Sequence, residues 1–153
     1  MSFRNFLPAF DPRLVVCRII ATQTLLYIAL GAWLLLLNGL RGRPATAIGL
    51  ELVFSCEALL LTHPSGSVVF TACFFNALAG GCSLCIVVER AKHCLDFAAT
   101  FYFVHLCCCL VYDGLPENWE WWVATGIDIT AMSLLGEYLC MRCEMRDISF
   151  FRR

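Results

Sequence analysis

Cysteine is the residue of this sequence with the widest scope for chemistry, and the chain has 11 of them. Four form two C-x-x-C pairs, Cys82 with Cys85 and Cys140 with Cys143. Such pairs serve thiol oxidoreductases, and four thiolates suit a tetrahedral zinc ion. The other cysteines are scattered through apolar stretches, where cysteine commonly packs as a small hydrophobic residue. We therefore expect packing cysteines, with no catalytic residue, cofactor or metal ligand, and keep a thiol enzyme and a shared zinc site as alternatives.

A second set of candidate residues is polar and lies inside three long apolar stretches: Asn76, His105 and Asp128. If each stretch is a helix that rises 1.5 Å per residue, each side chain lies about 10–14 Å from the same boundary. We therefore expect one polar layer, in which Asp128 accepts a hydrogen bond from His105 or Asn76. Such a layer either fixes the packing of the helices, which we favour, or forms the proton or ion site of a small transporter.

The composition indicates which elements must hold these side chains. The chain of 153 residues is 60% hydrophobic and 15% charged, against roughly 45–50% and 25% in soluble domains. One small core cannot hide this much apolar surface, and exposing it to water costs about 25 cal/mol per Å². The net charge of −1 provides no basic footprint for nucleic acid. An ordinary soluble enzyme, a disordered chain and a nucleic-acid binder are therefore excluded, and lipid is expected to surround most of the chain.

Four apolar stretches approach the roughly 20 residues that a membrane-spanning helix needs. The predicted spans cover residues 14–40, 67–88, 94–112 and 119–140, within one membrane domain (1–153) that ends in a short tail, 141–153. Because backbone amides in lipid must be satisfied within their own segment, we predict an all-α membrane protein, a compact bundle of four transmembrane helices. In the second span, Ala77, Gly80 and Gly81 are small enough to let another helix approach closely.

Residues 45–62 form an ambiguous segment between the first two spans. The segment is apolar, but it contains Glu51 and Glu57, each of which costs about 2.5–3.5 kcal/mol at the centre of a spanning helix. We predict a helix that lies at the lumenal membrane interface, and a fifth span is the alternative.

Lysine and arginine are divided unevenly between the two sides of a four-span bundle. One side holds only Arg41 and Arg43. The other side holds the N-terminal segment, the loop between the second and third spans, and the tail, with Arg4, Arg13, Arg18, Arg90, Lys92, Arg142, Arg146, Arg152 and Arg153. Because an excess of Lys and Arg marks the cytosolic side, we predict that both termini are cytosolic.

Two further expectations concern the cytosolic end of the bundle. Arg18 and Glu137 lie at similar depth, so we expect an ion pair that joins the first span to the fourth, with a snorkelling Arg18 as the alternative. Cys94, Cys140 and Cys143 lie next to the membrane, so S-palmitoylation stays open beside plain packing.

Two strings near the same end carry a resemblance to a known family, 92–97 (KHCLDF) and 136–142 (GEYLCMR). With shorter strings around them, such as 64–66 (PSG) and 121–122 (WW), they fall in an order and spacing that resembles the Sys-one family of small Golgi membrane proteins. The resemblance implies four spans, cytosolic termini, trans-Golgi membranes and a non-enzymatic role. It implies a receptor that recruits an Arf-related small GTPase without a myristoyl anchor, in support of vesicle tethering and protein trafficking.

A recruiting protein needs a docking surface outside the membrane, and this sequence leaves few residues there. We expect charged residues of the loop and the tail to steer the partner: Arg90, Lys92, Asp96, Arg142, Glu144 and Arg146. The alternative is that the basic residues only meet anionic membrane lipid, at about 1 kcal/mol per Lys or Arg. A small transporter and a membrane thiol enzyme remain as competing functions, and the formation of a homo-oligomer stays open.

Overall fold

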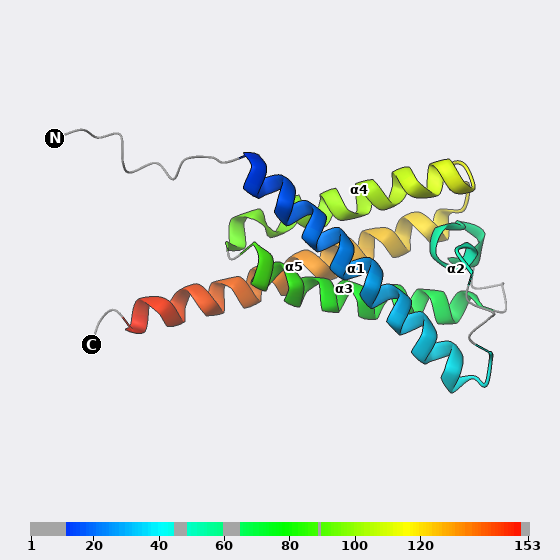
Figure 1. The fold of residues 1–153 in the computed structure, drawn as a ribbon, viewed down its shortest axis with the longest axis horizontal. Helices are drawn as coiled ribbons and strands as arrows, with labels where there is room; N and C mark the ends of the chain where they lie inside the picture. Colours follow the sequence, from blue (N-terminus) through cyan, green and yellow to red (C-terminus); the bar gives the residue numbers. More distant parts are fainter. Residues whose placement is uncertain (1–11, 45–48, 60–64, 89, 151–153) are drawn as a thin grey trace.

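The computed structural model describes residues 12–44, 49–59, 65–88 and 90–150 as a bundle of helices, with no strand in these ranges (Figure 1). Its α-helices are α1 (Pro12–Leu40), α2 (Glu51–Phe54), α3 (Gly66–Val87), α4 (Cys94–Tyr112) and α5 (Trp119–Phe150), with 3-10 turns at Glu57–Leu59 and Ala91–His93. In Figure 1, α3, α4 and α5 run roughly along the long axis, and α1 crosses them obliquely. The predicted all-α class is confirmed.

Three helical segments in the described part are long and apolar enough to cross a membrane: Pro12–Leu40, Gly66–Val87 and Ala91–Tyr112. They coincide with the first three predicted spans. The helix α5 covers the fourth predicted span and continues without a break to Phe150, so residues 141–150 extend the helix rather than form a loop. Its sequence is less apolar than the other three, because Asp128 and Glu137 interrupt it.

The described part of residues 45–62 contains two short helical pieces rather than one continuous helix. α2 ends before Ser55, whose ψ of 128° is extended. Asp113, which follows α4, accepts hydrogen bonds from Ser55 Oγ at 2.8 Å and from the backbone N–H of Cys56 at 3.0 Å. These bonds stabilise the extended backbone between the two helical pieces, so no fifth span runs through 49–59. Residues 45–48 and 60–62 lie outside the described part.

Cys56 is the cysteine held at this break. It is buried beside Cys109 and Trp121. Burial, together with the negative charge of Asp113, raises the pKa of the Cys56 thiol. The thiol therefore stays protonated at neutral pH, which suits a packing residue rather than a nucleophile.

The contact between α3 and α5, which run parallel, depends on glycine. Gly80 lies against Met132, and a Cβ built on Gly81 would come within 2.9 Å of the Leu135 Cβ. Gly136 of α5 packs in the same way against Leu84 of α3. Close backbone approach of this kind drives helix association in a membrane, where lipid tails are as apolar as the side chains.

Gly81→Ala tests this contact. The new methyl group would meet a Cβ, which cannot rotate away, so we expect a loss of stability of about 1–3 kcal/mol, the usual cost of overpacking. The matched control is Gly126→Ala on α5, because a Cβ there meets nothing within 4 Å. Thermal unfolding in detergent micelles should show a lower Tm for Gly81→Ala and an unchanged or higher Tm for Gly126→Ala. Equal Tm values would refute the close contact.

Candidate functional site

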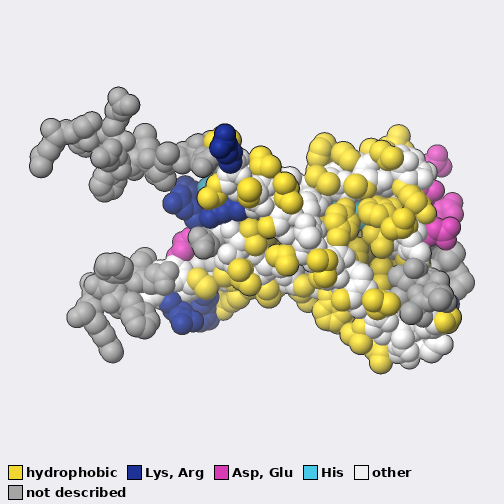
Figure 2. Space-filling view, in the orientation of Figure 1, with side chains coloured by type: hydrophobic (Ala, Val, Ile, Leu, Met, Phe, Trp, Pro, Cys, Tyr) yellow, Lys and Arg dark blue, Asp and Glu magenta, His cyan; other side chains and the backbone are white. Residues whose placement is uncertain are grey.

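Charged side chains separate to the two ends of the bundle (Figure 2). The basic end is where α1 and α4 begin and α3 and α5 end (Figure 1), and it carries Arg13, Arg18, Arg90, Lys92, Arg142 and Arg146. The acidic end carries Glu51, Glu57, Asp113, Glu117 and Glu120. The remaining basic residues predicted for the first end, Arg4, Arg152 and Arg153, lie outside the described residues.

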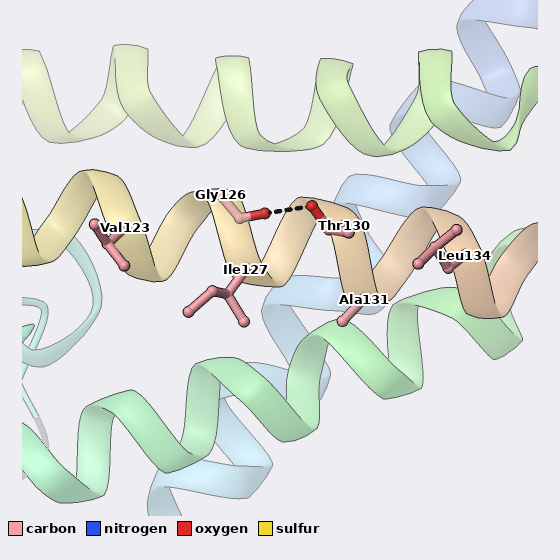
Figure 3. Close-up of a pocket in the computed structure, with 6 residues that line it drawn as sticks. All are labelled: Val123, Gly126, Ile127, Thr130, Ala131 and Leu134. Carbon is pink, nitrogen blue, oxygen red and sulfur yellow. Dashed lines mark hydrogen bonds between the residues drawn. The ribbon is translucent and has the colours of Figure 1, made fainter.

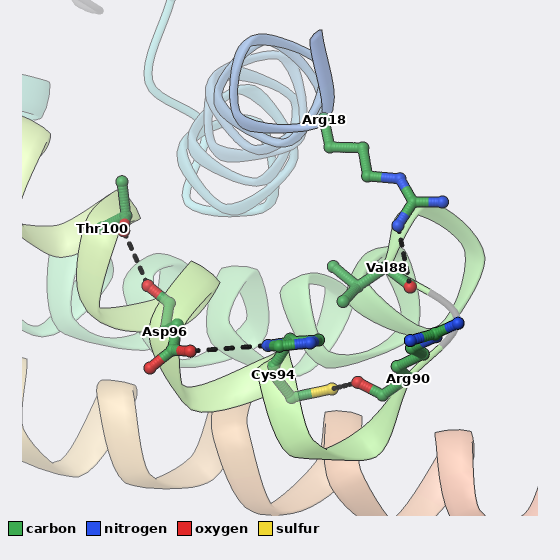
Figure 4. A network of polar contacts seen from close by, with 7 residues as sticks. Arg18, Val88, Arg90, Cys94, Asp96 and Thr100 are labelled. Atoms are coloured by element: carbon green, nitrogen blue, oxygen red, sulfur yellow. Dashed lines mark hydrogen bonds and ion pairs between the residues drawn. The ribbon is translucent and has the colours of Figure 1, made fainter. Parts of the chain in front are cut away.

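The turn between α3 and α4 supplies the first half of the candidate docking surface. Arg90, Lys92 and Asp96 are all exposed there. The carboxylate of Asp96 lies 3.6 Å from His93 Nδ1, and the backbone carbonyl of Asp96 accepts a hydrogen bond from Thr100 Oγ1 at 2.7 Å (Figure 4). These local contacts stabilise the first turn of α4, while the side chains of Arg90 and Lys92 are exposed.

The last turns of α5 supply the second half. The guanidinium of Arg142 donates to the Tyr138 hydroxyl at 2.7 Å and lies 5.2 Å from the centre of its ring. Oε1 of Glu144 accepts a hydrogen bond at 3.3 Å from the backbone N–H of Ala91, in the turn before α4. The structure thus joins the two predicted halves through Glu144. Sequence reasoning did not find Ala91, because a backbone donor leaves no signal in the side-chain pattern.

Arg18 does not form the expected ion pair with Glu137 in the described part of the chain. Its Nη1 instead donates to the carbonyl of Val88 at 3.3 Å (Figure 4). This carbonyl lies at the end of α3, where helix carbonyls lack partners and the helix dipole favours a cation. Arg18 therefore ties α1 to α3, while Glu137 is half-buried on α5.

The cysteines at the basic end pair between helices rather than within either C-x-x-C motif. Cys85 Sγ lies 3.6 Å from Cys143 Sγ, and Cys94 Sγ lies 3.6 Å from Cys140 Sγ. Cys82 is exposed and joins neither pair. Among the described residues, no three His, Cys, Asp or Glu side chains are arranged to hold a metal ion. The shared zinc site kept as an alternative is therefore not formed here.

The three residues of the predicted polar layer do not form one layer: Asn76 and Asp128 lie at one helix interface, and His105 lies at another. In the contact between α3 and α5, Gly80 lies against Met132 and Leu84 lies against Gly136, so facing residues differ by 52 in number. Asn76 and Asp128 also differ by 52, which places them at the same level of the two helices. Both polar side chains are buried, at 4% and 5% exposure. None of the hydrogen bonds between described residues joins the Asn76 amide to the Asp128 carboxyl group, and Oδ1 of Asn76 has no partner either, although the two residues face the same interface.

His105 belongs to a different interface. Its Nδ1 lies 3.3 Å from the Tyr27 hydroxyl of α1, and its ring stacks on Phe101. Its Nε2 lies 3.7 Å from Cys109 Sγ, within its own helix. The expected contact between His105 and Asp128 is therefore not formed; α4 presents His105 to α1 and α2.

A shallow apolar groove of about 500 Å³ runs along α5 (Figure 3). It is lined by Val123, Gly126, Ile127, Thr130, Ala131 and Leu134. The one hydroxyl among these side chains, that of Thr130, donates to the Gly126 carbonyl at 2.8 Å. The groove therefore offers apolar surface but no free polar group for chemistry.

Double-mutant cycles test the division of the polar layer. We expect Asn76→Ala and Asp128→Ala to be coupled by about 0.5–3 kcal/mol, as for residues that share one interface. His105→Ala and Asp128→Ala should be additive within about 0.5 kcal/mol, as for residues without a shared partner. Tm values of the single and double variants in detergent micelles measure both couplings. A coupled His105–Asp128 pair, or an additive Asn76–Asp128 pair, would contradict this arrangement.

Comparisons with known proteins identify the family. The family model SYS1, described as "Integral membrane protein S linking to the trans Golgi network", matches residues 7–150. A "Protein SYS1 homolog" of Nematostella vectensis is 36% identical over 139 residues, which cover 91% of this chain and 87% of the relative. A "Protein SYS1 homolog" of Dictyostelium discoideum is 38% identical over 144 residues, which cover 94% of this chain and 61% of the relative.

No solved structure matches the chain. The matches nevertheless cover nearly all of it, including both strings that carry the resemblance, 92–97 and 136–142. The predicted family is therefore confirmed. With its apolar, membrane-spanning helices and this match, the chain belongs to the SYS1 family of integral membrane proteins.

Proposed function

We propose that this protein is a Golgi-resident multi-pass receptor that recruits an Arf-related small GTPase to trans-Golgi membranes. It has no enzymatic role, and it supports vesicle tethering and protein trafficking. The observation that carries the proposal is a group of exposed charged side chains at the basic end. We name it the docking surface and define it as Arg90, Lys92, Asp96, Arg142, Glu144 and Arg146. Its two halves come from segments 53 residues apart and are joined by the hydrogen bond from Ala91 to Glu144. Membership of a family linked to the trans-Golgi network supports the location.

The proposal includes α5 as a fourth span. The helix packs against α3 through Gly80, Gly81 and Gly136. Its buried acid, Asp128, faces that interface rather than the surroundings. A carboxyl group inside a bundle is compatible with a spanning helix, because protein rather than lipid surrounds it. With four spans, α1 begins and α5 ends at the basic end, and the excess of Lys and Arg assigns that end to the cytosol and residues 45–62 to the lumen.

The docking surface suits a partner that arrives by diffusion. Exposed charges of both signs steer the encounter and select a complementary surface. Tyr138 already holds the guanidinium of Arg142, and Glu144 already holds the turn, so binding orders few further groups. The partner then lies at the membrane surface, where an amphipathic helix of its own inserts beside the bundle. A transporter built on Asn76, His105 and Asp128 has less support, because His105 contacts Tyr27 instead of Asp128.

Charge reversal tests recruitment. In cells depleted of the endogenous protein, wild type should restore a fluorescent Arf-related GTPase to the Golgi. The variant Arg90→Glu/Lys92→Glu/Arg142→Glu/Arg146→Glu should lower the Golgi signal about tenfold or more, which equals at least about 1.4 kcal/mol of binding. Arg41→Glu/Arg43→Glu, at the other end of α1, is the matched control and should recruit normally. Undiminished recruitment by a reversed variant that itself reaches the Golgi would refute the docking surface.

Glu144 tests whether the two halves must be joined. Glu144→Ala removes the acceptor for the Ala91 N–H, whereas Glu144→Gln keeps a carbonyl oxygen in its place. We expect the Ala variant in nanodiscs to bind the GTPase severalfold more weakly, with the Gln variant close to wild type. Binding is measured by bio-layer interferometry on the immobilised nanodiscs. Equal losses in both variants would mean that the charge of Glu144 acts, and the bond to Ala91 does not.

A further inference from the structure

Four thiols form a group at the basic end that the docking surface does not use. Cys85 lies in the last turn of α3, 3.6 Å from Cys143 of α5. Cys94, the first residue of α4, lies 3.6 Å from Cys140 of α5. The four thiols come from three helices, α3, α4 and α5, and form two close pairs at the same end of the bundle.

The two close pairs differ in access from outside. Cys94 and Cys140 are 0% and 1% exposed. Cys143 is exposed, and Cys85 is half-buried beside it. A small oxidant dissolved in water therefore meets Cys143 first, and Cys85 is the nearest thiol outside the sealed pair. The inner pair has the same sulfur separation and provides an internal comparison for the effect of burial.

We propose that Cys85 and Cys143 are a redox modification site, which forms a reversible disulfide when a peroxide reaches the basic end. The Cys143 thiolate attacks one oxygen of hydrogen peroxide, gives a sulfenic acid and releases hydroxide. The Cys85 sulfur then attacks the sulfenic sulfur, and water leaves as the disulfide forms. Overall, two thiols and one hydrogen peroxide give one disulfide and two water molecules, and two electrons pass from sulfur to oxygen.

The two sulfur atoms need to move only a short distance to form the disulfide. A disulfide needs a sulfur separation of about 2.05 Å, against 3.6 Å between the two thiols here. Both residues lie near helix ends, Cys85 two residues before the end of α3 and Cys143 in the last turns of α5. Accessible disulfides of this kind are readily reduced by thiol exchange, so in a reducing compartment the pair rests as two thiols and closes only during oxidation.

The disulfide would tie α5 to the end of α3, across 58 residues of sequence. Cys143 precedes Glu144 in α5, and Cys85 lies six residues before Ala91, so the disulfide would act beside the bond that joins α5 to the turn before α4. Oxidation would therefore fix the relative position of the two halves of the docking surface. This consequence rests on the proposed function, whereas formation of the disulfide does not.

The test uses the full chain in native membranes. After treatment with hydrogen peroxide, free thiols are blocked with maleimide, and disulfides are then reduced and labelled with a mass tag. We expect two of the 11 cysteines to acquire the tag, and mass spectrometry of the unreduced sample to show a Cys85–Cys143 link within one chain. Cys143→Ser should abolish both results. Cys82→Ser, which removes an exposed thiol one turn earlier on α3, is the matched control and should leave both intact.

Several outcomes would overturn the proposal. These are a tag that persists in Cys143→Ser, a link between Cys140 and Cys143 or between two chains, and thiols that all stay free at a peroxide dose that oxidises a reference protein dithiol. Because Cys143 is exposed, its serine variant should fold as wild type does, which size-exclusion chromatography in detergent verifies. Recruitment of the GTPase is assayed separately. A disulfide that forms in a protein without recruitment would count against the proposed function and leave this site in place.

Discussion

The parallel contact between α3 and α5 is the constraint on which the other features of this bundle depend. Where Gly80, Gly81 and Gly136 remove side-chain bulk, the two backbones approach closely, and their register is fixed. That register sets Asn76 level with Asp128 in the middle of the bundle. In lipid, the gain from association comes from packing and interhelical polar contacts, so a few missing methyl groups decide which helices pair.

The positions of the helices could be predicted from the sequence because hydropathy is a local property. A run of apolar residues must satisfy its own backbone in lipid, whatever its neighbours are. The rotation of each helix about its own axis could not be predicted in the same way. Its lipid-facing and buried sides are both apolar, so the sequence has no periodic pattern that would distinguish them. For this reason the direction of His105, toward Tyr27 rather than Asp128, could not be read from the chain.

Other features were out of reach because they depend on backbone atoms. The break at Ser55 exists because the carboxylate of Asp113, far away in sequence, accepts from a hydroxyl and a backbone N–H. Arg18 likewise bonds to a carbonyl at the end of α3. The C-x-x-C spacing was misleading for a related reason. The partner of a thiol depends on which helices pack together, so Cys85, Cys140 and Cys143 each meet a thiol of another helix, whereas Cys82 is exposed and joins neither pair.

The extension of α5 past the predicted boundary bears on how so small a chain can present a binding surface. A flexible tail would have to be ordered when a partner binds, at a cost of about 0.5–1.5 kcal/mol for each immobilised side chain. A helix that simply continues from the bundle carries Arg142, Glu144 and Arg146 on a backbone that is already fixed. The bond to Ala91 then joins the turn before α4 to this helix. Most residues of this protein lie in long apolar helices, so few are left to bind a partner. A helix end that is already ordered loses less conformational entropy on binding than a loop does, which favours the basic end as the place of the proposed receptor role.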